Sequence, residues 1–392
     1  MIETILGATS ATRTAEAQPK TTRGPLYDSA ELGFRPYWYP AMLSRHLGKK
    51  PQAIKMLGDN LVFVRAGGRV RALQDLCAHR GMPLSAGKCL TDGTITCPYH
   101  GWTYDVTDGR CVAALTDGPQ SPIVGKRRTS VPTYQVEERG GIIFVYMGTG
   151  EPPALEENIP SEILRPDWTS QTVVSVWSCN WRAAVENGFD AGHASMVHRK
   201  SLRWRTQMAL QPAWSNVKQS EVVGDYLRYG SGKPGPAEDV YPVVGRWPRH
   251  SWLRRKLAEV GQKNKQGRPY GNEFRLPCII HNRYFYYTHF RWAVPVDANT
   301  TRNFQVFAGP YQGTRGTALK VHYWLWHRWA FHMLFNGQDE AIVTKLDYAA
   351  PERLYRPDRS IVDLRKYIEN NVRREDDFRP ERQPEDMAGI LD

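Results

Sequence analysis

Two pairs of cysteine and histidine lie close together in the sequence. The first pair is Cys77 and His79, and the second, after seventeen intervening residues, is Cys97 and His100. Each pair offers one thiolate and one imidazole as metal ligands. Tetrahedral zinc accepts such mixtures, but zinc ribbons usually bring two cysteines together in each loop. The alternation therefore favours a [2Fe–2S] cluster in which both cysteines hold one iron and both histidines hold the other.

Neutral histidine ligands change the electrochemistry of such a cluster. Replacing two thiolates by imidazoles removes negative charge and raises the reduction potential, so the cluster accepts electrons readily. The other cysteines are isolated in sequence, and we interpret them as small packed apolar side chains: Cys89, Cys111, Cys179 and Cys278. Six cysteines in 392 residues make no disulfide framework, which fits a reducing compartment and a cytoplasmic location.

A second group of potential metal ligands lies further along the chain. Asp190, His193 and His198 stand in the stretch NWRAAVENGFDAGHASMVHRK, which has helical character. Asp190 and His193 would share one helical face, whereas His193 and His198 would lie ~140° apart on an ideal α-helix. For both imidazoles to bind one metal ion the helix must be distorted, and we predict a π-bulge at residues 194–197.

Two histidines need a carboxylate to complete the 2-His-1-carboxylate iron site, which leaves coordination positions open for O2 beside a substrate. Asp339 is the candidate, because it follows Phe335 by one helical turn and precedes apolar residues that could anchor the helix. Glu340 and Asp347 are alternatives. Short acidic pairs on helices are mostly solvated, so the spacing alone does not single out Asp339.

The elements that must position the cysteine–histidine pairs are strands. Residues 60–73 indicate a hairpin, and residues 142–148 indicate a fully apolar buried strand. We therefore predict a small all-β domain over residues 31–150, with loops that grip the metal. A flexible lead-in over residues 1–30 precedes it.

The glycine- and proline-rich stretch 148–160 is the best domain boundary, and a second domain is expected over residues 151–372. Residues 201–275 are rich in turns and basic residues, so we expect irregular excursions there. A charged tail over residues 373–392 ends the chain. Three consecutive antiparallel strands are expected in HNRYFYYTHFRWAVPV, TTRNFQVFAG and ALKVHYWLW, followed by a helix in FNGQDEAIVTKLDYAA.

The chain is basic, with a formal charge of +12. Lys126, Arg127 and Arg128 form one basic cluster, and residues 199–205 and the tryptophan-bearing segment 246–256 form two others. No RNA-recognition, KH or helix-turn-helix signature accompanies them, so we expect no nucleic-acid partner. An acidic protein partner explains the charge better, although any single cluster can also be a solvated face.

Some classes of protein are disfavoured by the absence of a pattern. No segment approaches the ~20 consecutive apolar residues that span a bilayer, so we expect no stable membrane insertion. The role of segment 246–256 stays open, because a membrane-surface contact there lacks a clear amphipathic pattern. No G-x-G-x-x-G fingerprint is present, so a nicotinamide cofactor would bind another protein.

With both ligand groups in view, the chain resembles the α-subunits of the Rieske non-haem iron ring-hydroxylating oxygenases. The resemblance is carried by TITCPYHGWTYD and NWRAAVENGFDAGHASMVH, resumes more weakly at FNGQDEAIV, and covers most of residues 31–350. Within the family the chain is most similar to the carbazole dioxygenase type, with the 2-oxoquinoline monooxygenase type related. The implied fold is α+β, with an all-β Rieske domain and a catalytic domain whose antiparallel sheet is flanked by helices, of the helix-grip type.

The resemblance also implies roles for individual residues. The cluster ligands would be Cys77, His79, Cys97 and His100, and the ligands of a mononuclear Fe(II) would be His193, His198 and Asp339. Asp190 would be a bridging carboxylate that takes hydrogen bonds from His193 and from a cluster histidine, His100, of a neighbouring subunit. Asn187 would sit beside the iron, Gly188 would offer its carbonyl to a ring N–H, and Phe335 would form a pocket wall.

The activity implied by the resemblance is insertion of O2 into an aromatic or heteroaromatic, carbazole-like substrate. Electrons from NADH would arrive through a separate reductase and a ferredoxin, for which Lys126–Arg128 is the best docking patch. The two metals of one subunit are too far apart for fast electron transfer in this family. The resemblance therefore implies a head-to-tail homotrimer without β-subunits.

Two features leave the substrate open. Four residues separate His193 from His198, where the closest carbazole enzymes have three, and residues 201–275 match the family poorly. Regiochemistry, and the choice between dioxygenation and monooxygenation or demethylation, stay open as well. A non-catalytic electron carrier is a further alternative, but it would need only the first domain.

Overall fold

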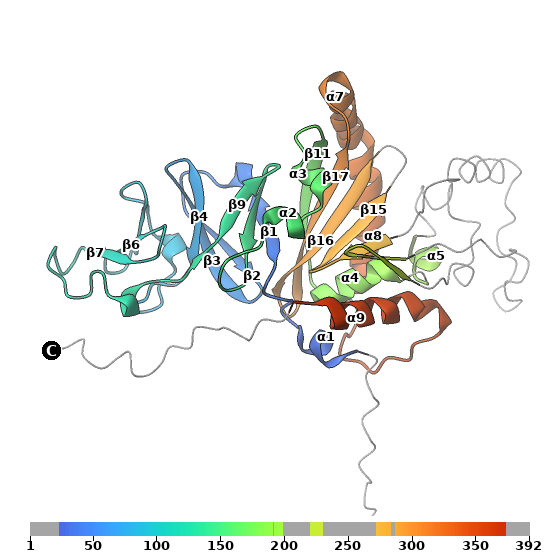
Figure 1. Ribbon diagram of the computed structural model, residues 1–392, viewed down its shortest axis with the longest axis horizontal. Helices are drawn as coiled ribbons and strands as arrows, with labels where there is room; N and C mark the ends of the chain where they lie inside the picture. The colour runs from blue at the N-terminus through green and yellow to red at the C-terminus, as the bar shows by residue number, and fades with distance from the viewer. Residues whose placement is uncertain (1–22, 191, 199–219, 230–271, 284–286, 374–392) are drawn as a thin grey trace, which may run out of the picture.

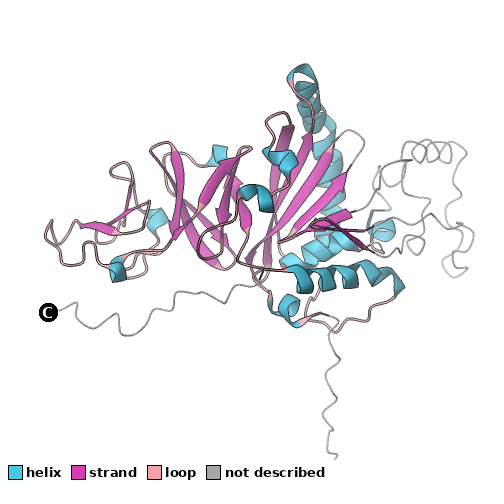
Figure 2. Cartoon of the chain, in the orientation of Figure 1, coloured by secondary structure: helices cyan, strands magenta, loops and turns pink. Residues whose placement is uncertain are grey.

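The computed structural model describes residues 23–190, 192–198, 220–229, 272–283 and 287–373. These residues form two strand-rich parts that lie next to each other (Figure 1), and the longer helices all accompany the second part (Figure 2). The predicted α+β organisation is confirmed. The predicted C-terminal tail lies outside the described residues, apart from Arg373.

Residues 38–146 form three antiparallel sheets, with strand orders β1–β10–β9, β2–β3–β4–β8 and β5–β6–β7. The strands are β1 Trp38–Leu43, β2 Gln52–Met56, β3 Asp59–Ala66, β4 Arg69–Gln74, β5 Thr94–Thr96, β6 Trp102–Asp105, β7 Cys111–Ala114, β8 Thr133–Tyr134, β9 Val136–Arg139 and β10 Ile142–Tyr146. The predicted hairpin is confirmed as β3 and β4. Gly67 and Gly68 at its turn have φ values of +54° and +74°, which glycine adopts without strain.

The second part contains one seven-stranded antiparallel sheet in the order β11–β17–β16–β15–β14–β13–β12. Its strands are β11 Thr169–Trp177, β12 Glu221–Val223, β13 Tyr226–Arg228, β14 Asn272–Arg275, β15 Ile279–Arg283, β16 Thr288–Asp297 and β17 Thr300–Gly309. Strands β12 to β14 correct the expectation that residues 201–275 are irregular, because these short segments pair onto the sheet edge. The rest of that segment lies outside the described residues.

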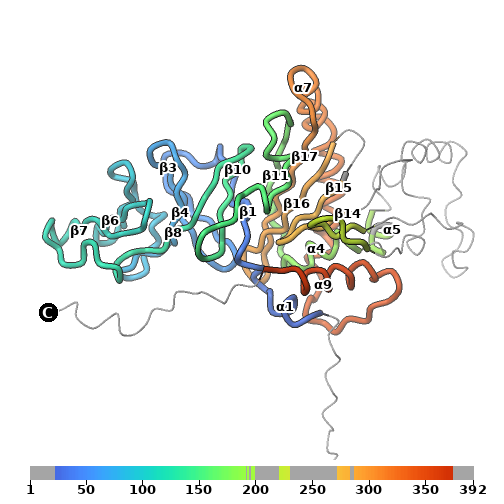
Figure 3. The backbone as a smooth tube through the Cα atoms, viewed as in Figure 1, coloured from blue at the N-terminus to red at the C-terminus, as the bar shows by residue number. Residues whose placement is uncertain are grey.

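Helices cover the sheet of the second part and join the two ends of the chain. They are α1 Pro25–Ser29, α2 Leu155–Asn158, α3 Ser161–Leu164, α4 Trp181–Phe189, α5 Ala194–Val197, α7 Gly313–His322, the π-helix η9 Tyr323–Phe335, α8 Asn336–Val343 and α9 Arg359–Asn371. Short 3-10 turns are η1 Ser44–His46, η2 Leu84–Ala86, η3 Arg127–Thr129 and η10 Arg356–Asp358. Helix α4 packs on β16, and α9 packs on both α4 and α1 although α1 and α9 are far apart in sequence (Figure 3).

One predicted strand is a helix. The stretch ALKVHYWLW belongs to α7 and η9 and not to a third strand after β16 and β17. Strand β17 already pairs with β16 on one edge and with β11 on the other. A following strand would therefore find no free backbone groups beside β17, whereas a helix satisfies its own.

The predicted flexible lead-in is wrong for its last residues. Pro25–Ser29 form α1, and Tyr27 is fully buried with its hydroxyl donating to Glu186 over 2.9 Å. The backbone N–H of Tyr27 also donates to Glu369 in α9. These long-range contacts order the segment, while residues 1–22 lie outside the described residues.

The two parts share one apolar core. Side chains of β1 and β10 belong to the same buried cluster as those of α4, β16 and β17. The backbone N–H of Leu57 donates to the Pro295 carbonyl, and that of Gly58 donates to the Val296 carbonyl. The boundary segment 148–160 is anchored as well, because the Trp38 indole donates to the Pro153 carbonyl over 2.8 Å. The domain limits at residues 150 and 151 stay a prediction.

Two candidate metal centres

The two cysteine–histidine pairs lie on two loops of similar construction in the β5–β6–β7 end of the first part. The N–H of Cys77 donates to the Met82 carbonyl, and the N–H of Gly81 donates to the Cys77 carbonyl. In the second loop Cys97 bonds in the same way to Trp102, and Gly101 bonds back to Cys97. The two glycines have φ values of +73° and +66°. Each loop is thus closed tightly on itself, which fixes the direction of its thiol.

The four side chains differ in exposure. Cys77 and Cys97 are buried in the apolar core of this end, whereas His79 is exposed and His100 is half-buried. The two imidazoles lie 4.5 Å apart between ring centroids, and His79 stacks on Trp102 at 4.7 Å. The arrangement would hold a cluster with its cysteine side inside the fold and its histidine side at the surface.

The Cys77 thiol shows how the loops suit a metal. Burial raises the pKa of Cys77, and a 3.1 Å hydrogen bond with the Tyr104 hydroxyl lowers it only in part. A buried thiol with a raised pKa favours the protonated form, unless a cation takes the place of the proton. The donor set, two buried thiols and two outward imidazoles, fits a [2Fe–2S] cluster.

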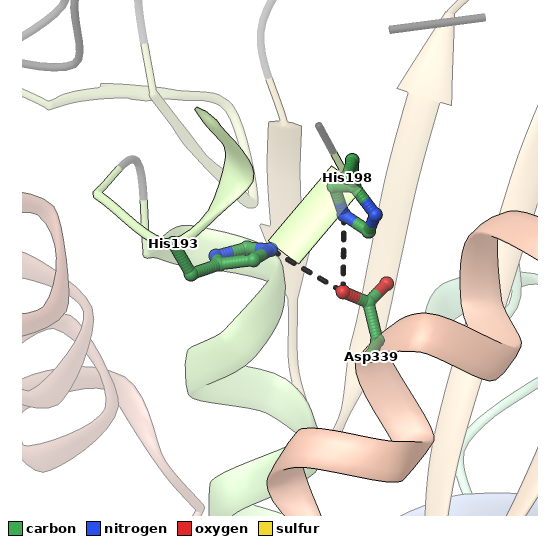
Figure 4. A group of neighbouring side chains, drawn as sticks. All are labelled: His193, His198 and Asp339. Atoms are coloured by element: carbon green, nitrogen blue, oxygen red, sulfur yellow. Dashed lines mark ion pairs between the residues drawn. The ribbon is translucent and has the colours of Figure 1, made fainter. Parts of the chain in front are cut away.

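The second group brings together three residues from two distant segments. The Nε2 atoms of His193 and His198 lie 3.3 and 3.1 Å from the same oxygen of Asp339, Oδ1. One ligand atom from each of the three lies within 4.8 Å of the others. Figure 4 shows both imidazoles directed at the Asp339 carboxylate, which comes from α8. Within the described residues this is the only such group found.

Hydrogen bonds on the far side of each ring set its tautomer. His193 Nδ1 lies 2.6 Å from the Asp190 main-chain carbonyl, which can only accept, so Nδ1 carries the proton. His198 Nδ1 lies 3.1 Å from Gln338 Oε1, which is also an acceptor. Both Nε2 atoms therefore face the position that they share with Asp339, where a metal ion can replace the Nε2 protons.

A break in the helix delivers the two histidines. Helix α4 ends at Phe189, Asp190 takes an extended conformation, and a new short helix, α5, begins at Ala194. The helix is therefore distorted as required, but the predicted π-bulge over 194–197 is wrong. The Asp190 carboxylate explains the position of the break, because it accepts hydrogen bonds from the N–H groups of Gly192 and His193 and so caps the turn.

The charges of this group are balanced for a cation. Burial alone would lower the pKa of His193, but the Asp190 and Asp339 carboxylates raise it to about 9. Burial also opposes ionisation of Asp339, yet hydrogen bonds from His193 and His198 hold its pKa well below the usual value. A buried carboxylate that draws positive charge, beside two imidazoles whose Nε2 protons a metal ion can replace, has the donor chemistry of a 2-His-1-carboxylate iron site.

Comparison with known proteins identifies the family. Residues 37–135 match the family model described as the Rieske [2Fe-2S] domain, and residues 146–374 match the model described as homotrimeric ring hydroxylase. The protein is a Rieske ring hydroxylase. It is thus an oxygenase, and its family carries a [2Fe–2S] cluster and a mononuclear iron.

The relatives of this ring hydroxylase include two terminal oxygenase components of carbazole 1,9a-dioxygenase. That of Sphingomonas sp is 32% identical, and the match covers 89% of this chain and 94% of the relative. That of Metapseudomonas resinovorans is 34% identical over 72% of this chain and 74% of the relative. The solved terminal oxygenase from Nocardioides aromaticivorans superposes with a TM-score of 0.72 at 28% identity, covering 87% of this chain and 95% of that one.

The other predicted site residues of the ring hydroxylase differ in their contacts with the group of His193, His198 and Asp339. The Asn187 amide lies 3.5 Å from Asp339 Oδ1, beside the metal-ligand group. Phe335 stacks on His198 with ring centroids 3.6 Å apart. The Gly188 carbonyl accepts a hydrogen bond from the Asn272 side chain, so a ring N–H would have to displace that amide.

The Asp190 carboxylate accepts a hydrogen bond from the His193 main-chain N–H at 3.2 Å, and its expected role as a bridge between subunits stays a prediction. The His193 ring bonds to the main-chain carbonyl of Asp190, while the carboxylate Oδ2 lies 3.6 Å from His193 Nδ1. The Asp190 side chain keeps 29% of its surface exposed, which leaves it open to a residue from another subunit.

The basic residues Lys126–Arg128 lie at the same end of the ring hydroxylase as the two cysteine–histidine loops. The Thr129 hydroxyl is buried and donates to the Ile123 carbonyl, while the three basic side chains are exposed. The N–H of Gly125 also donates to the carbonyl of Cys111, in β7. The loop is thus anchored beside the sheet of the cysteine–histidine loops.

Sequence reasoning missed Gln338, which orients His198 from the position next to Asp339. It also missed the ion pairs of Glu186 with Arg365, which tie α4 to α9. Glutamine and glutamate are common on helices, so no signal marked them.

No helix among the described residues is both long and apolar enough to cross a membrane.

Proposed function

We propose that this protein is the terminal oxygenase component of a multicomponent ring-hydroxylating dioxygenase that inserts O2 into an aromatic or heteroaromatic substrate. The observation that carries the proposal is the convergence of His193, His198 and Asp339, with both Nδ1 atoms engaged elsewhere. The similarity to carbazole 1,9a-dioxygenase terminal oxygenases over most of both chains supports a carbazole-like substrate.

The residues that would hold the cofactors follow from the two centres. Cys77, His79, Cys97 and His100 would hold the [2Fe–2S] cluster, and His193, His198 and Asp339 would hold the mononuclear Fe(II). When bound, the cluster supplies single electrons and the iron supplies the site at which O2 is reduced.

The remaining residues would orient the metal ligands and enclose the substrate. The Asp190 carbonyl keeps the proton on His193 Nδ1, and Gln338 does the same for His198, so both rings keep their Nε2 atoms toward Asp339. Phe335 would form one wall of the substrate site, against the His198 ring. Asn187 donates toward the carboxylate of Asp339, which would hold it in place.

We also propose a head-to-tail homotrimer and an external ferredoxin. The family is described as homotrimeric, and a solved structure similar to this chain (TM-score 0.73, 28% identity) is of a carbazole dioxygenase oxygenase in complex with its ferredoxin. The half-exposed Asp190 carboxylate would accept a hydrogen bond from a cluster histidine, His100, of the next subunit. Lys126, Arg127 and Arg128 would receive an acidic ferredoxin, and the protein would act in the cytoplasm.

A Rieske monooxygenase or demethylase acting on another hydrophobic substrate is the second candidate. The Gly188 carbonyl, proposed for a ring N–H, is already bonded to Asn272, which weakens the case for carbazole itself. Dicamba O-demethylase of Stenotrophomonas maltophilia is also similar, with 34% identity over 48% of this chain.

A single turnover would decide between these functions. Chemically reduced, fully loaded protein is mixed with carbazole and related heteroaromatics under oxygen-18 gas, and the label in each product is counted by mass spectrometry. We expect two labelled oxygen atoms in one ring-hydroxylated product. A single label, or loss of a methyl group from a methylated substrate, would establish the monooxygenase alternative, and no product from any aromatic would overturn the proposal.

A further inference from the structure

Buried polar side chains without partners lie beside the metal-ligand group, between the sheet and η9. Neither ring nitrogen of His289 has a hydrogen-bond partner in the part of the chain that the structure describes, and the same is true of Nε2 of His332 and the hydroxyl of Tyr323. His289 is 2% exposed, His332 9% and Tyr323 1%. Burying unbonded polar atoms costs free energy, so a ligand that bonds them is favoured.

The His332 ring lies next to both of the other side chains. The His332 ring lies 5.6 Å from the His289 ring and 5.8 Å from the Tyr323 ring, between centroids. His289 comes from β16, while Tyr323 and His332 come from η9, which packs across the sheet. The surrounding side chains are aromatic, with Phe331 at 4.8 Å from His289 and Phe307 at 5.3 Å from Tyr323. The polar atoms therefore stand in an otherwise apolar wall.

The group is continuous with the proposed iron site. Phe331 stacks on Phe335 at 5.4 Å, and Phe335 stacks on His198 at 3.6 Å. His332 and Asp339 stand seven residues apart on one continuous helical run, which corresponds to about 10 Å along an α-helix axis. An aromatic molecule of two or three rings, with one end at the iron ligands, would place its other end among these side chains.

The proton positions indicate what kind of group fits. Gln305 Oε1 accepts from both the Asn336 amide and His332 Nδ1, so the proton of His332 is on Nδ1 and its Nε2 offers a lone pair. Tyr323 offers an O–H, and neutral His289 offers one N–H and one lone pair. Burial lowers the pKa of His332 to about 4 and that of His289 well below its usual value, so both rings are uncharged at neutral pH.

We propose that His289, His332 and Tyr323 form a distal subsite that binds an uncharged hydroxyl group on the substrate, at the end away from the oxidised carbon. The hydroxyl would donate to His332 Nε2 and accept from Tyr323 or His289. Among the described residues no guanidinium donates a hydrogen bond to these side chains: that of Arg291 is engaged with the Ala184 carbonyl at 2.8 Å and with the Trp177 ring, and that of Arg328 lies over the Trp324 ring. A carboxylate there would have no direct cationic partner. The inference rests on the proposed function and names its substrate class, aromatic compounds that carry a hydroxyl.

The test compares ligands that differ in one group. Binding of 4-hydroxybiphenyl, 4-methylbiphenyl, 4-methoxybiphenyl and biphenyl-4-carboxylate to the fully loaded protein is measured by calorimetry without oxygen. The hydroxyl compound should bind about tenfold more tightly than the methyl compound, as one or two buried hydrogen bonds allow. The methoxy compound, which cannot donate, and the carboxylate should show no such gain. Equal binding of the hydroxyl and methyl compounds would overturn the subsite.

Variants then assign the preference to these side chains. Tyr323→Phe removes only the hydroxyl, and His289→Phe and His332→Phe remove the ring nitrogens; each should reduce the hydroxyl preference to about twofold or less. The same change at exposed His46, His46→Phe, should leave it intact. Tyr323→Phe and His289→Phe remove only buried unbonded atoms, so their thermal unfolding midpoints should be at or above that of the parent. His332→Phe also loses the hydrogen bond to Gln305, and a cooperative unfolding transition shows that this variant folds. A preference that survives all three variants would place the hydroxyl elsewhere.

Failure of this inference is distinguishable from failure of the proposed function. Oxygen-18 incorporation into biphenyl without any hydroxyl preference in binding would remove the subsite and leave the oxygenase. A hydroxyl preference without oxygenation of any aromatic would leave the subsite and overturn the proposed oxygenase function.

Discussion

At the scale of single residues, the far-side hydrogen bonds of the histidines matter as much as the ligands themselves. The Asp190 carbonyl and Gln338 each hold one Nδ1 proton, which leaves the opposite nitrogen of His193 and His198 for a metal. The carboxylate that completes the group is Asp339, 4% exposed, and neither of its sequence alternatives joins it. Glu340 is half-buried and Asp347 is exposed.

This choice of carboxylate is testable by counting iron. Asp339→Ala should reduce the iron content from about three to about two per chain, because one ligand of three is lost while the cluster loops are untouched. The visible absorption of the cluster should stay unchanged. The measurement is iron analysis by mass spectrometry together with absorption spectra. Asp347→Ala, just beyond the end of α8, is the control and should retain three; loss of iron in the control alone would reverse the assignment.

At the scale of elements, α4 is held in place by buried ion pairs. Arg365 of α9 bonds to Glu186 of α4 at 2.7 and 3.0 Å and to Glu352 at 2.7 and 2.8 Å. Tyr27 of α1 also donates to Glu186. Since α4 leads directly into Asp190 and His193, this network positions the start of the proposed iron site.

Removing the shared cation should be costly. Arg365 is 1% exposed, so Arg365→Met would leave the buried Glu186 carboxylate without its ion-pair partner and Glu352 with Arg23 alone, and would lower the free energy of unfolding by about 3–5 kcal/mol. The expected result is a clearly lower midpoint in thermal or urea unfolding. Lys366→Met, the same kind of change on the exposed face of α9, should shift stability by less than about 0.5 kcal/mol. Equal midpoints for the two variants would show that the network does not stabilise α4.

The same network predicts a dependence of stability on pH. Burial alone would raise the pKa of Glu352, but hydrogen bonds from Arg365 and Arg23 lower it from 4.5 to about 2. The stabilisation from the ionised carboxylate is therefore complete above about pH 4.5 and is lost as the pH falls toward 2. Glu352→Gln should lower the unfolding midpoint at pH 7. The difference between the midpoints of the variant and the parent should become smaller between pH 4.5 and 3. A gap that is constant with pH would contradict the assignment.

At the scale of the whole molecule, the proposed trimer makes each active site depend on two subunits. Subunits that carry Asp339→Ala and subunits that carry His79→Ala should each be inactive as homotrimers. Co-expressed with different tags and purified as mixed trimers, they should regain about a third of the parent activity, because one of the three interfaces in each mixed ring joins an intact cluster to an intact iron site. Mixed trimers of confirmed composition that stay inactive would place both functions within one subunit.

The basic end of the molecule carries a second prediction at this scale. Lys126→Glu should slow electron delivery from an acidic ferredoxin several-fold at low salt, and raising the ionic strength should slow the parent in the same direction. Steady-state turnover at a series of ferredoxin and salt concentrations measures both effects. Lys50→Glu makes the same charge change at another exposed site of the first domain and should leave the rate of electron delivery nearly unchanged. Turnover that is independent of salt would remove this docking surface.

Short-range patterns in the sequence were enough for much of this description. The Cys-x-His and Cys-x-x-His pairs, and Asp190 with its two histidines, are spaced closely enough for their own loops and turns to bring them together. The all-β character of the first part followed from local alternation and turn residues, the α+β class was implied by the family resemblance, and the family match confirms the cluster domain.

Long-range packing decided the rest. A helical pattern does not say where a helix breaks, and the break at Asp190 depends on a carboxylate that caps the next turn. The stretch after β17 became helical because both edges of that strand were already paired. Asp339 lies over a hundred residues from His198, and His289 and His332 come from a strand and a π-helix, so no spacing could relate them. Such pairs meet only after the sheet and its covering helices have packed, since burial, and not sequence distance, selects which polar side chains face each other.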